Sequence, residues 1–138
     1  MSGDVSDCNR ATELVVTMAN QSGAFARLFS ILEAAGVNTN AFFAPEAKDG
    51  GKLRVVVDNP QRAREALRAA KIGFLEEEVA VIEMYNRPGA FGRVATRLAE
   101  SGIDIKHAYA STAPFAWTRV LVAVSDLPRA LDLLTIDK

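Results

Sequence analysis

The chain has 138 residues, of which 49% are hydrophobic, and its 16 basic and 17 acidic side chains give a formal net charge of -1. This composition is typical of a globular protein, and the absence of a block of Lys or Arg argues against nucleic acid as a partner. No stretch approaches the roughly 18 apolar residues of a membrane span, and the N-terminus lacks the apolar run of a signal peptide. We therefore expect a cytoplasmic protein with no membrane partner.

The N-terminal residues 1–10 are polar and are interpreted as a flexible tail. They include Cys8, the only cysteine of the sequence, which we interpret as an incidental surface thiol. A single cysteine also excludes an intrachain disulfide and a thiolate metal cluster. The folded part of the chain is expected to begin at residue 11.

The first half of the chain predicts an alternation of strands and helices. From Ala24, apolar residues recur at helical spacing until Gly36, which suits the left-handed residue that ends a helix. Asn59 followed by Pro60 is a typical helix start, with Asn as the cap and Pro at the first helical position. The expected elements are strands at 13–18, 37–44 and 53–57, a hairpin turn at 45–52, helices from Ala24 and Pro60, and an extended segment from Ile72.

The second half repeats this order and then ends one strand short. Its expected elements are strands at 79–84, 103–111 and 118–124, a helix at 91–98, and a last helix capped by Asp126. In this topology the last strand pairs beside the first, so another segment or another chain must cover the open edge. One candidate is the extended stretch 74–85, which would be the last strand of the first copy and the first strand of the second. Within it, the acidic run 76–78 is interpreted as a solvated linker.

A shift of the chain by 66 positions, the distance from Gly23 to Gly89, reveals an internal repeat. Residues 20–36 then lie over 86–102, with identical residues at seven of the seventeen positions. A period of this length indicates two copies of one small domain. We therefore expect an α+β fold of two ferredoxin-like βαββαβ domains in tandem, residues 11–77 and 78–138, each an antiparallel sheet with helices on one face. The second copy lacks an obvious last strand.

The motif at the start of each repeat resembles that of the ACT domain, a ligand-sensing module attached to many enzymes of amino-acid metabolism. In the second copy, Asn86-Arg87-Pro88-Gly89-Ala90-Phe91 is followed, after a helix, by Gly102-Ile103-Asp104-Ile105. The first copy has Asn20-Gln21-Ser22-Gly23-Ala24-Phe25 and Gly36-Val37-Asn38-Thr39, without the proline. The resemblance spans nearly the whole chain, and it implies two tandem ACT domains that bind an amino acid.

The physical chemistry of this motif suits a small ligand with a carboxylate. Gly23 and Gly89 precede a helix, where a residue without Cβ lets the ligand approach the first N–H groups of the helix. Asn38 and Asp104, at the head of the next strand, offer oxygen acceptors to an α-ammonium group. In the ACT family such residues face each other across an interface between two domains, so the resemblance implies a site between the copies or between two chains. The ligand-binding residues implied in this way are Asn20, Ser22, Gly23, Ala24, Phe25, Asn38, Asn86, Pro88, Gly89, Ala90, Phe91 and Asp104.

Plainer interpretations of several residues stay open. Gly23 and Gly89 also suit simple turns. Phe25 and Phe91 either form apolar walls for the ligand or face the core. His107, the only histidine, belongs to no visible catalytic set and is interpreted as structural.

We expect a regulatory protein that senses an L-amino acid, needs no other cofactor and no metal, and acts as a homodimer on a separate enzyme or regulator of amino-acid metabolism. It is not expected to be an enzyme, because the sequence shows no Ser-His-Asp set, Walker pattern or metal-ligand spacing. Strand 53–57 has no aromatic residue, unlike that of an RNA-recognition module, and one cysteine cannot form the pair of a metal-delivery domain. The second hypothesis is a ligand-free assembly module for dimerisation or partner docking.

Overall fold

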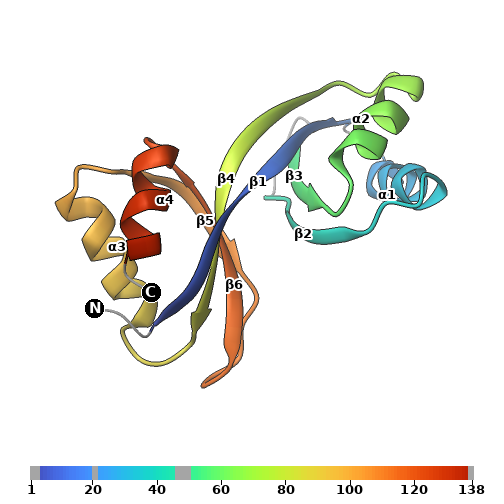
Figure 1. Cartoon of the computed structure of the whole chain (residues 1–138). Coiled ribbons are helices and arrows are strands. Elements are labelled where there is room, and N and C mark those ends of the chain that lie inside the picture. The colour runs from blue at the N-terminus through green and yellow to red at the C-terminus, as the bar shows by residue number, and fades with distance from the viewer. Residues whose placement is uncertain (1–3, 20–21, 46–50, 137–138) are drawn as a thin grey trace. The chain divides into compact units, whose positions relative to one another are not determined.

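The computed structural model describes residues 4–19, 22–45 and 51–136. In chain order its elements are β1 (Val5–Met18), α1 (Ala24–Ala34), β2 (Thr39–Phe43), β3 (Gly51–Val57), α2 (Pro60–Ala69), β4 (Phe74–Tyr85), α3 (Ala90–Glu100), β5 (Ile105–Ala110), β6 (Trp117–Val124) and α4 (Leu127–Ile136) (Figure 1). Within the described residues the strands form one antiparallel sheet in the order β2-β3-β1-β4-β6-β5. This is the α+β fold expected from the sequence. The predicted hairpin turn at 45–52 lies mostly outside the described residues.

The chain divides into two compact units. One unit is Thr12–Glu77, and the other combines the segment that ends at Ala11 with the segment that begins at Glu78. β1 and β4 contribute residues to both units. The extended stretch 74–85 is therefore a single strand shared by the two copies, as the sequence predicted.

The flexible tail predicted for residues 1–10 is wrong for its described part, because β1 begins at Val5. Val5 is only 3% exposed, and Cys8 is buried rather than a surface thiol. The Tyr85 N–H group donates to the Asp4 carbonyl at 2.9 Å, so the N-terminal part of β1 lies beside β4. This segment is the strand that the second copy otherwise lacks. Sequence pattern alone missed it because its side chains are mostly polar and only a few point inward.

Each unit has its own apolar core. In the 12–77 unit, alternate residues of β1 and β3 pack against α1 and α2; the core residues are Leu14, Val16, Leu28, Leu32, Val37, Leu53, Val55, Val57, Ala63 and Leu67. In the other unit, β4 and β6 pack against α3 and α4, and Val5 and Cys8 join residues such as Ile82, Met84, Val94, Leu98, Val122 and Leu134. The two helices of each unit therefore cover the same face of its strands. No helix among the described residues is long and apolar enough to cross a membrane.

Three helices end in the same left-handed turn. Gly36 (φ 72°) follows α1, Gly102 (φ 74°) follows α3, and Lys71 (φ 58°) follows α2. In each case the N–H group of the next residue donates to the carbonyl five residues back, at 3.0 Å after α1 and 2.9 Å after α2 and α3. The glycine stop predicted at Gly36 is confirmed, and Gly102, its counterpart in the repeat, has the same conformation. Lys71 was not predicted, because nothing about a lysine signals a left-handed backbone.

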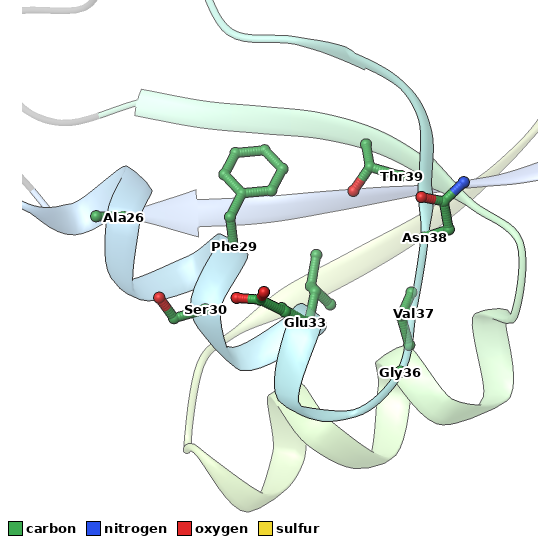
Figure 2. Close-up of a pocket in the computed structure, with 9 residues that line it drawn as sticks. Ala26, Phe29, Ser30, Glu33, Gly36, Val37, Asn38 and Thr39 are labelled. Atoms are coloured by element: carbon green, nitrogen blue, oxygen red, sulfur yellow. The ribbon is translucent and has the colours of Figure 1, made fainter.

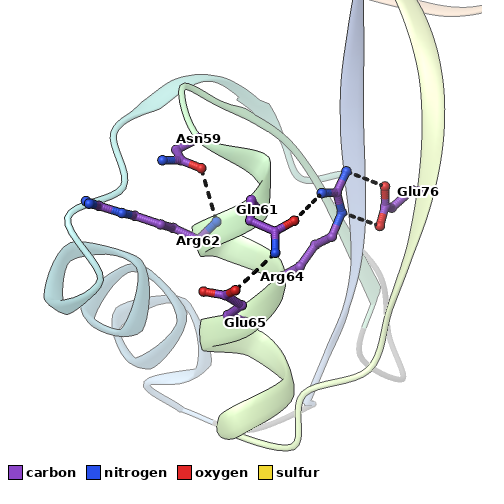
Figure 3. Close-up of polar contacts among 6 residues, drawn as sticks. All are labelled: Asn59, Gln61, Arg62, Arg64, Glu65 and Glu76. Carbon is purple, nitrogen blue, oxygen red and sulfur yellow. Dashed lines mark hydrogen bonds and ion pairs between the residues drawn. The ribbon is translucent and has the colours of Figure 1, made fainter.

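The start of α2 is capped as predicted. The Asn59 side chain accepts a hydrogen bond from the Arg62 N–H group at 3.1 Å, and Pro60 is the first helical residue (Figure 3). At α4 the Asp126 carboxylate accepts a hydrogen bond from the Arg129 N–H group at 3.2 Å. Both helices therefore begin with a side-chain cap.

The acidic run 76–78 is part of β4 and not a solvated linker. Arg64 of α2 donates two hydrogen bonds to Glu76, at 2.7 and 3.0 Å, and this pairing lowers the pKa of the Glu76 carboxyl group (Figure 3). Arg54 of β3 contacts Glu77 at 3.1 Å and the fully buried Glu13 at 2.8 Å. Ion pairs of these acidic residues therefore connect α2 and β3 to β4.

Candidate functional site

The two glycines of the repeated motif are the residues that immediately precede α1 and α3. Gly23 has φ 85° and Gly89 has φ 83°, a left-handed conformation that favours glycine over any L residue. Neither α1 nor α3 has a side-chain cap, in contrast to α2 and α4, which have Asn59 and Asp126. The first-turn N–H groups of α1 and α3 therefore lack the side-chain oxygen that would otherwise satisfy them.

The residues around the glycines differ between the copies. Phe25 is 48% exposed, whereas Phe91 is half-buried and packs against the core of its unit. Ala24 is half-buried and Ala90 is buried. Ser22 and Pro88 are exposed, and the predicted site residue Asn20 lies outside the described residues.

Asn86 holds a loop. Its side-chain amide donates to the Ala113 carbonyl at 2.8 Å, its backbone N–H group donates to the Ala116 carbonyl at 2.8 Å, and its carbonyl accepts from the Phe115 N–H group at 2.8 Å. The Tyr85 hydroxyl donates to the Phe115 carbonyl at 2.8 Å. Asn86 therefore fixes the β5–β6 connection against the end of β4.

Asn38 and Asp104 are held by their backbones and not by their side chains. The Asn38 N–H group donates to Asp58 Oδ1 at 2.9 Å, and the Asp104 N–H group donates to Ser125 Oγ at 2.9 Å. Both side chains are exposed, and neither has a side-chain hydrogen bond to another described residue. The structure therefore leaves these two side-chain oxygens exposed.

Asn38 lines an open hollow of about 690 Å³ between α1 and the segment that leads from α1 into β2 (Figure 2). Its polar lining includes the Glu33 carboxylate, the Ser30 hydroxyl and Thr39, with Phe29 as an aromatic wall. None of the described residues that line it is basic, but Arg62 Nη1 would lie 3.3 Å from a Cβ atom at Gly36, which is one of the lining residues. Gly23 is not part of its lining, so this hollow does not bring the two predicted halves of the first site together.

A smaller hollow of about 230 Å³ brings together three predicted residues of the second copy. Asn86, Ala90 and Phe91 line it with residues of β4, β5 and β6, including Tyr109 and Thr118. Its lining is mainly apolar, with a few hydroxyl groups. The hollow therefore has the character of a pocket for a small apolar side chain. Asp104 is not among its lining residues.

The structure adds one feature that sequence reasoning missed. The Asp4 carboxylate is buried and accepts hydrogen bonds from Arg93 Nε at 2.6 Å and Nη2 at 3.2 Å, with Arg87 Nε at 3.7 Å. The Arg93 hydrogen bonds lower the pKa of the Asp4 carboxyl group. A Cβ atom at Gly89 would lie 2.7 Å from Arg93 Nη1, so the guanidinium group lies over this glycine. At Gly23 a Cβ atom would meet no other group within 4 Å.

One signal in the sequence pointed to this arginine. Arg93 is identical to Arg27 in the repeat, at the same distance from the motif glycine. Asp4 left no signal of its own, because its place beside Tyr85 depends on the pairing of strands distant in sequence.

Comparison with known proteins identifies the fold family. Residues 10–126 match the family model described as ACT domain pair. The chain belongs to this family. No curated protein sequence matches the ACT domain pair described here.

Solved structures support the same assignment. The ACT domain pair is similar to the protein BT0572 from Bacteroides thetaiotaomicron, with 25% identity, a TM-score of 0.88 and coverage of 95% of this chain and 90% of that one. It is similar in fold to the regulatory subunit of aspartate kinase from Thermus thermophilus, with 18% identity, a TM-score of 0.67 and coverage of 98% and 99%. E. coli aspartokinase III, solved with aspartate and ADP, has 17% identity and a TM-score of 0.63 over 94% of this chain and 32% of that one. These structures share the fold of the ACT domain pair.

Proposed function

We propose that this ACT domain pair is a cytoplasmic sensor that binds an L-amino acid and acts on a separate enzyme or regulator of amino-acid metabolism. The observation that carries the proposal is the difference in capping among the four helices of the described residues. α2 and α4 have side-chain caps, whereas the two helices that follow the motif glycines have none. The repeat therefore leaves two helix starts without a side-chain cap, although at α3 the Ala90 N–H group donates to the Arg87 carbonyl at 3.0 Å.

An open helix start attracts the α-carboxylate of an amino acid. The dipole of the helix contributes about 0.3 to 1 kcal/mol for an anion at this end, and each N–H hydrogen bond to a charged oxygen adds about 1.5 to 3 kcal/mol. The α-ammonium group then needs an acceptor, and Asn38 and Asp104 offer exposed oxygens for it. In this proposal the acceptor comes from another ACT domain, of this chain or of a second copy in a homodimer.

The two copies differ in how accessible the motif glycine and the helix start behind it are. Arg93, held by Asp4, lies over Gly89, whereas the space beside Gly23 is open. Asn38 is neutral, whereas Asp104 carries a charge that strengthens an ammonium contact. We therefore expect the two copies to bind the amino acid with unequal affinity, with the helix start at Gly23 the more accessible.

A thermal-shift screen of the whole chain against the twenty L-amino acids at millimolar concentration tests the proposal. A ligand at about a hundredfold its Kd adds roughly 2.7 kcal/mol of apparent stability, so a selective rise in Tm is expected for one or a few amino acids. Gly23→Ala should abolish or reduce this rise, because Cβ blocks the approach to α1. Gly92→Ala is the matched control, since a Cβ atom there meets nothing within 4 Å and Gly92 does not have a left-handed backbone. A flat screen, or equal shifts in both variants, would contradict the proposal.

A ligand-free assembly module is the second candidate function, and exposed aromatic side chains favour it. Phe115 is 65% exposed and Trp117 59% exposed, although a core or interface position is usual for such residues. Trp117 packs edge-on against Tyr85, with 5.4 Å between the ring centroids. Phe42, on the edge strand β2, is 56% exposed.

Sedimentation of the chain with and without amino acids separates the two functions. The assembly function predicts a dimer in both conditions that Trp117→Ser and Phe42→Ser weaken. The sensor function predicts a selective Tm response that survives Trp117→Ser. A monomer at all concentrations together with a flat thermal-shift screen would contradict both.

A further inference from the structure

The 12–77 unit has another hollow, where β1 ends, α1 begins and the α2–β4 connection passes. Its volume is about 410 Å³, and Val16, Leu28 and Ile72 form part of an apolar wall. Arg27 and Lys71 also line it, and none of the described residues in its lining is acidic. We call this hollow the Arg27–Lys71 pocket.

The pairing of strands shows which residue of the other unit corresponds to Lys71. The Thr17 N–H group donates to the Gly73 carbonyl at 3.1 Å, and the Tyr85 N–H group donates to the Asp4 carbonyl at 2.9 Å. The repeat distance of 66 residues makes Glu83 the counterpart of Thr17, and Tyr85 lies two residues after Glu83. On the partner segment of the first copy, the matching step runs backwards by two residues, from Gly73 to Lys71. Counted along this antiparallel register, Asp4 of the second copy corresponds to Lys71 of the first, which itself lies in the turn between α2 and β4.

At this place the second copy already contains a bound carboxylate. Asp4 accepts two hydrogen bonds from Arg93, the counterpart of Arg27, and is only 5% exposed. In the first copy the carboxylate is replaced by the ammonium group of Lys71. Within the described part of the chain, neither Arg27 nor Lys71 has a side-chain hydrogen bond or ion pair. The first copy thus has a pocket with two basic side chains, Arg27 and Lys71. At the corresponding place the second copy has an arginine, Arg93, which is paired with the Asp4 carboxylate.

The backbone of Lys71 adds to this contrast. Lys71 adopts the left-handed conformation (φ 58°) at the position that Gly36 and Gly102 occupy after α1 and α3. Glycine adopts this conformation without the steric penalty that a lysine side chain brings. Lys71 therefore places a basic side chain at the wall of the pocket, at a backbone position that favours glycine.

We propose that the Arg27–Lys71 pocket binds a small organic acid that has an apolar body and no α-ammonium group. Its carboxylate is held by Arg27 and Lys71 as the Asp4 carboxylate is held by Arg93, and its body lies against Val16, Leu28 and Ile72. An α-ammonium group is excluded because the described lining offers it two basic groups and no acid. This ligand class differs from that of the amino-acid sensor, and the inference does not rest on the proposed function.

An NMR titration of the 15N-labelled whole chain tests the inference with three probes. The probes are 4-methylpentanoate, its neutral amide, and L-leucine, which is the same acid with an α-ammonium group. We expect 4-methylpentanoate to shift the amide signals of Thr17, Ile72 and Gly73, and the other two probes to shift them much less. Arg27→Gln and Lys71→Gly should each weaken the affinity for 4-methylpentanoate about tenfold or more, as expected for the loss of a hydrogen bond to a charged group.

Two further variants separate a specific site from general charge attraction. Arg62→Gln removes an exposed arginine of the same unit that does not line the pocket, so its affinity should equal that of the unaltered chain. Lys71→Asp supplies an internal carboxylate to Arg27, as Asp4 does to Arg93, and should abolish binding while the chain stays folded. The inference is overturned if 4-methylpentanoate causes no shifts at these amides, if Arg62→Gln weakens binding as much as Arg27→Gln, or if L-leucine or the neutral amide binds there as tightly as the acid.

Discussion

Val5→Ala tests whether the N-terminal segment is an integral strand of the second copy. Val5 is 3% exposed and belongs to the core that contains Ile82, Met84 and Val122. The substitution removes two buried methyl groups, worth about 0.8 kcal/mol each, and leaves a small cavity that adds to the loss. The expected destabilisation is about 2 kcal/mol. Ser6→Ala, at the exposed neighbouring position of the same strand, loses only a long hydrogen bond of 3.4 Å to the Glu83 carbonyl and should change stability by less than about 0.5 kcal/mol.

Urea denaturation of the two variants measures these values, with the unfolding followed by the fluorescence of Trp117, the only tryptophan. Amide hydrogen exchange adds a local readout at Tyr85, whose N–H group donates to the Asp4 carbonyl. Exchange at Tyr85 should be slow in the unaltered chain and faster in Val5→Ala. Equal stabilities of the two variants, or rapid exchange at Tyr85 in the unaltered chain, would refute the assignment of this segment to the core.

Three further predictions concern the Asp4 pair, the glycines and the cysteine. Because the Arg93 hydrogen bonds lower the folded-state pKa of Asp4, the pair stabilises the fold above the unfolded-state pKa of about 3.9, and this contribution is lost as the pH falls through the folded-state pKa. In urea denaturation between acid and neutral pH, Asp4→Asn should lack this part of the pH dependence; an unchanged profile would contradict the pairing. Gly92→Ala, in the first turn of α3, should raise the free energy of unfolding by about 0.5 to 1 kcal/mol, whereas Gly23→Ala, at φ 85°, should lower it by about 1 kcal/mol. Changes of the same sign would show that backbone conformation does not control the stability effects at these two glycines. The Cys8 thiol should react with a thiol reagent only after denaturation, and rapid reaction in the folded chain would show that it is not buried.

Much of the fold was predictable because local signals were strong. The helix start at Asn59 and Pro60, the glycine stops at Gly36 and Gly102, and the shared strand 74–85 all follow from side-chain chemistry that acts over a few residues. The internal repeat then extended these signals to the topology of two copies. The family assignment rests on the same repeated motif.

The features that escaped prediction depend on contacts between residues distant in sequence. Residues 4–10 alternate too weakly to indicate a strand, and their place beside β4 becomes visible only in the sheet. The composition of the acidic run 76–78 predicts side chains that contact only solvent, but two of them form ion pairs with arginines from α2 and β3. The repeat also hid a difference, because Phe25 and Phe91 are identical in sequence but unequal in exposure.

The most direct test of the sensor account is an NMR titration of the 15N-labelled chain with each of the twenty L-amino acids. The account predicts that one or a few amino acids shift the first-turn amides of α1, residues 24–27, and that the corresponding amides of α3, residues 90–93, respond more weakly. Gly23→Ala should remove the shifts in α1. Saturating shifts confined to other parts of the chain, or no shifts with any amino acid, would contradict the claim that these open helix starts bind the ligand.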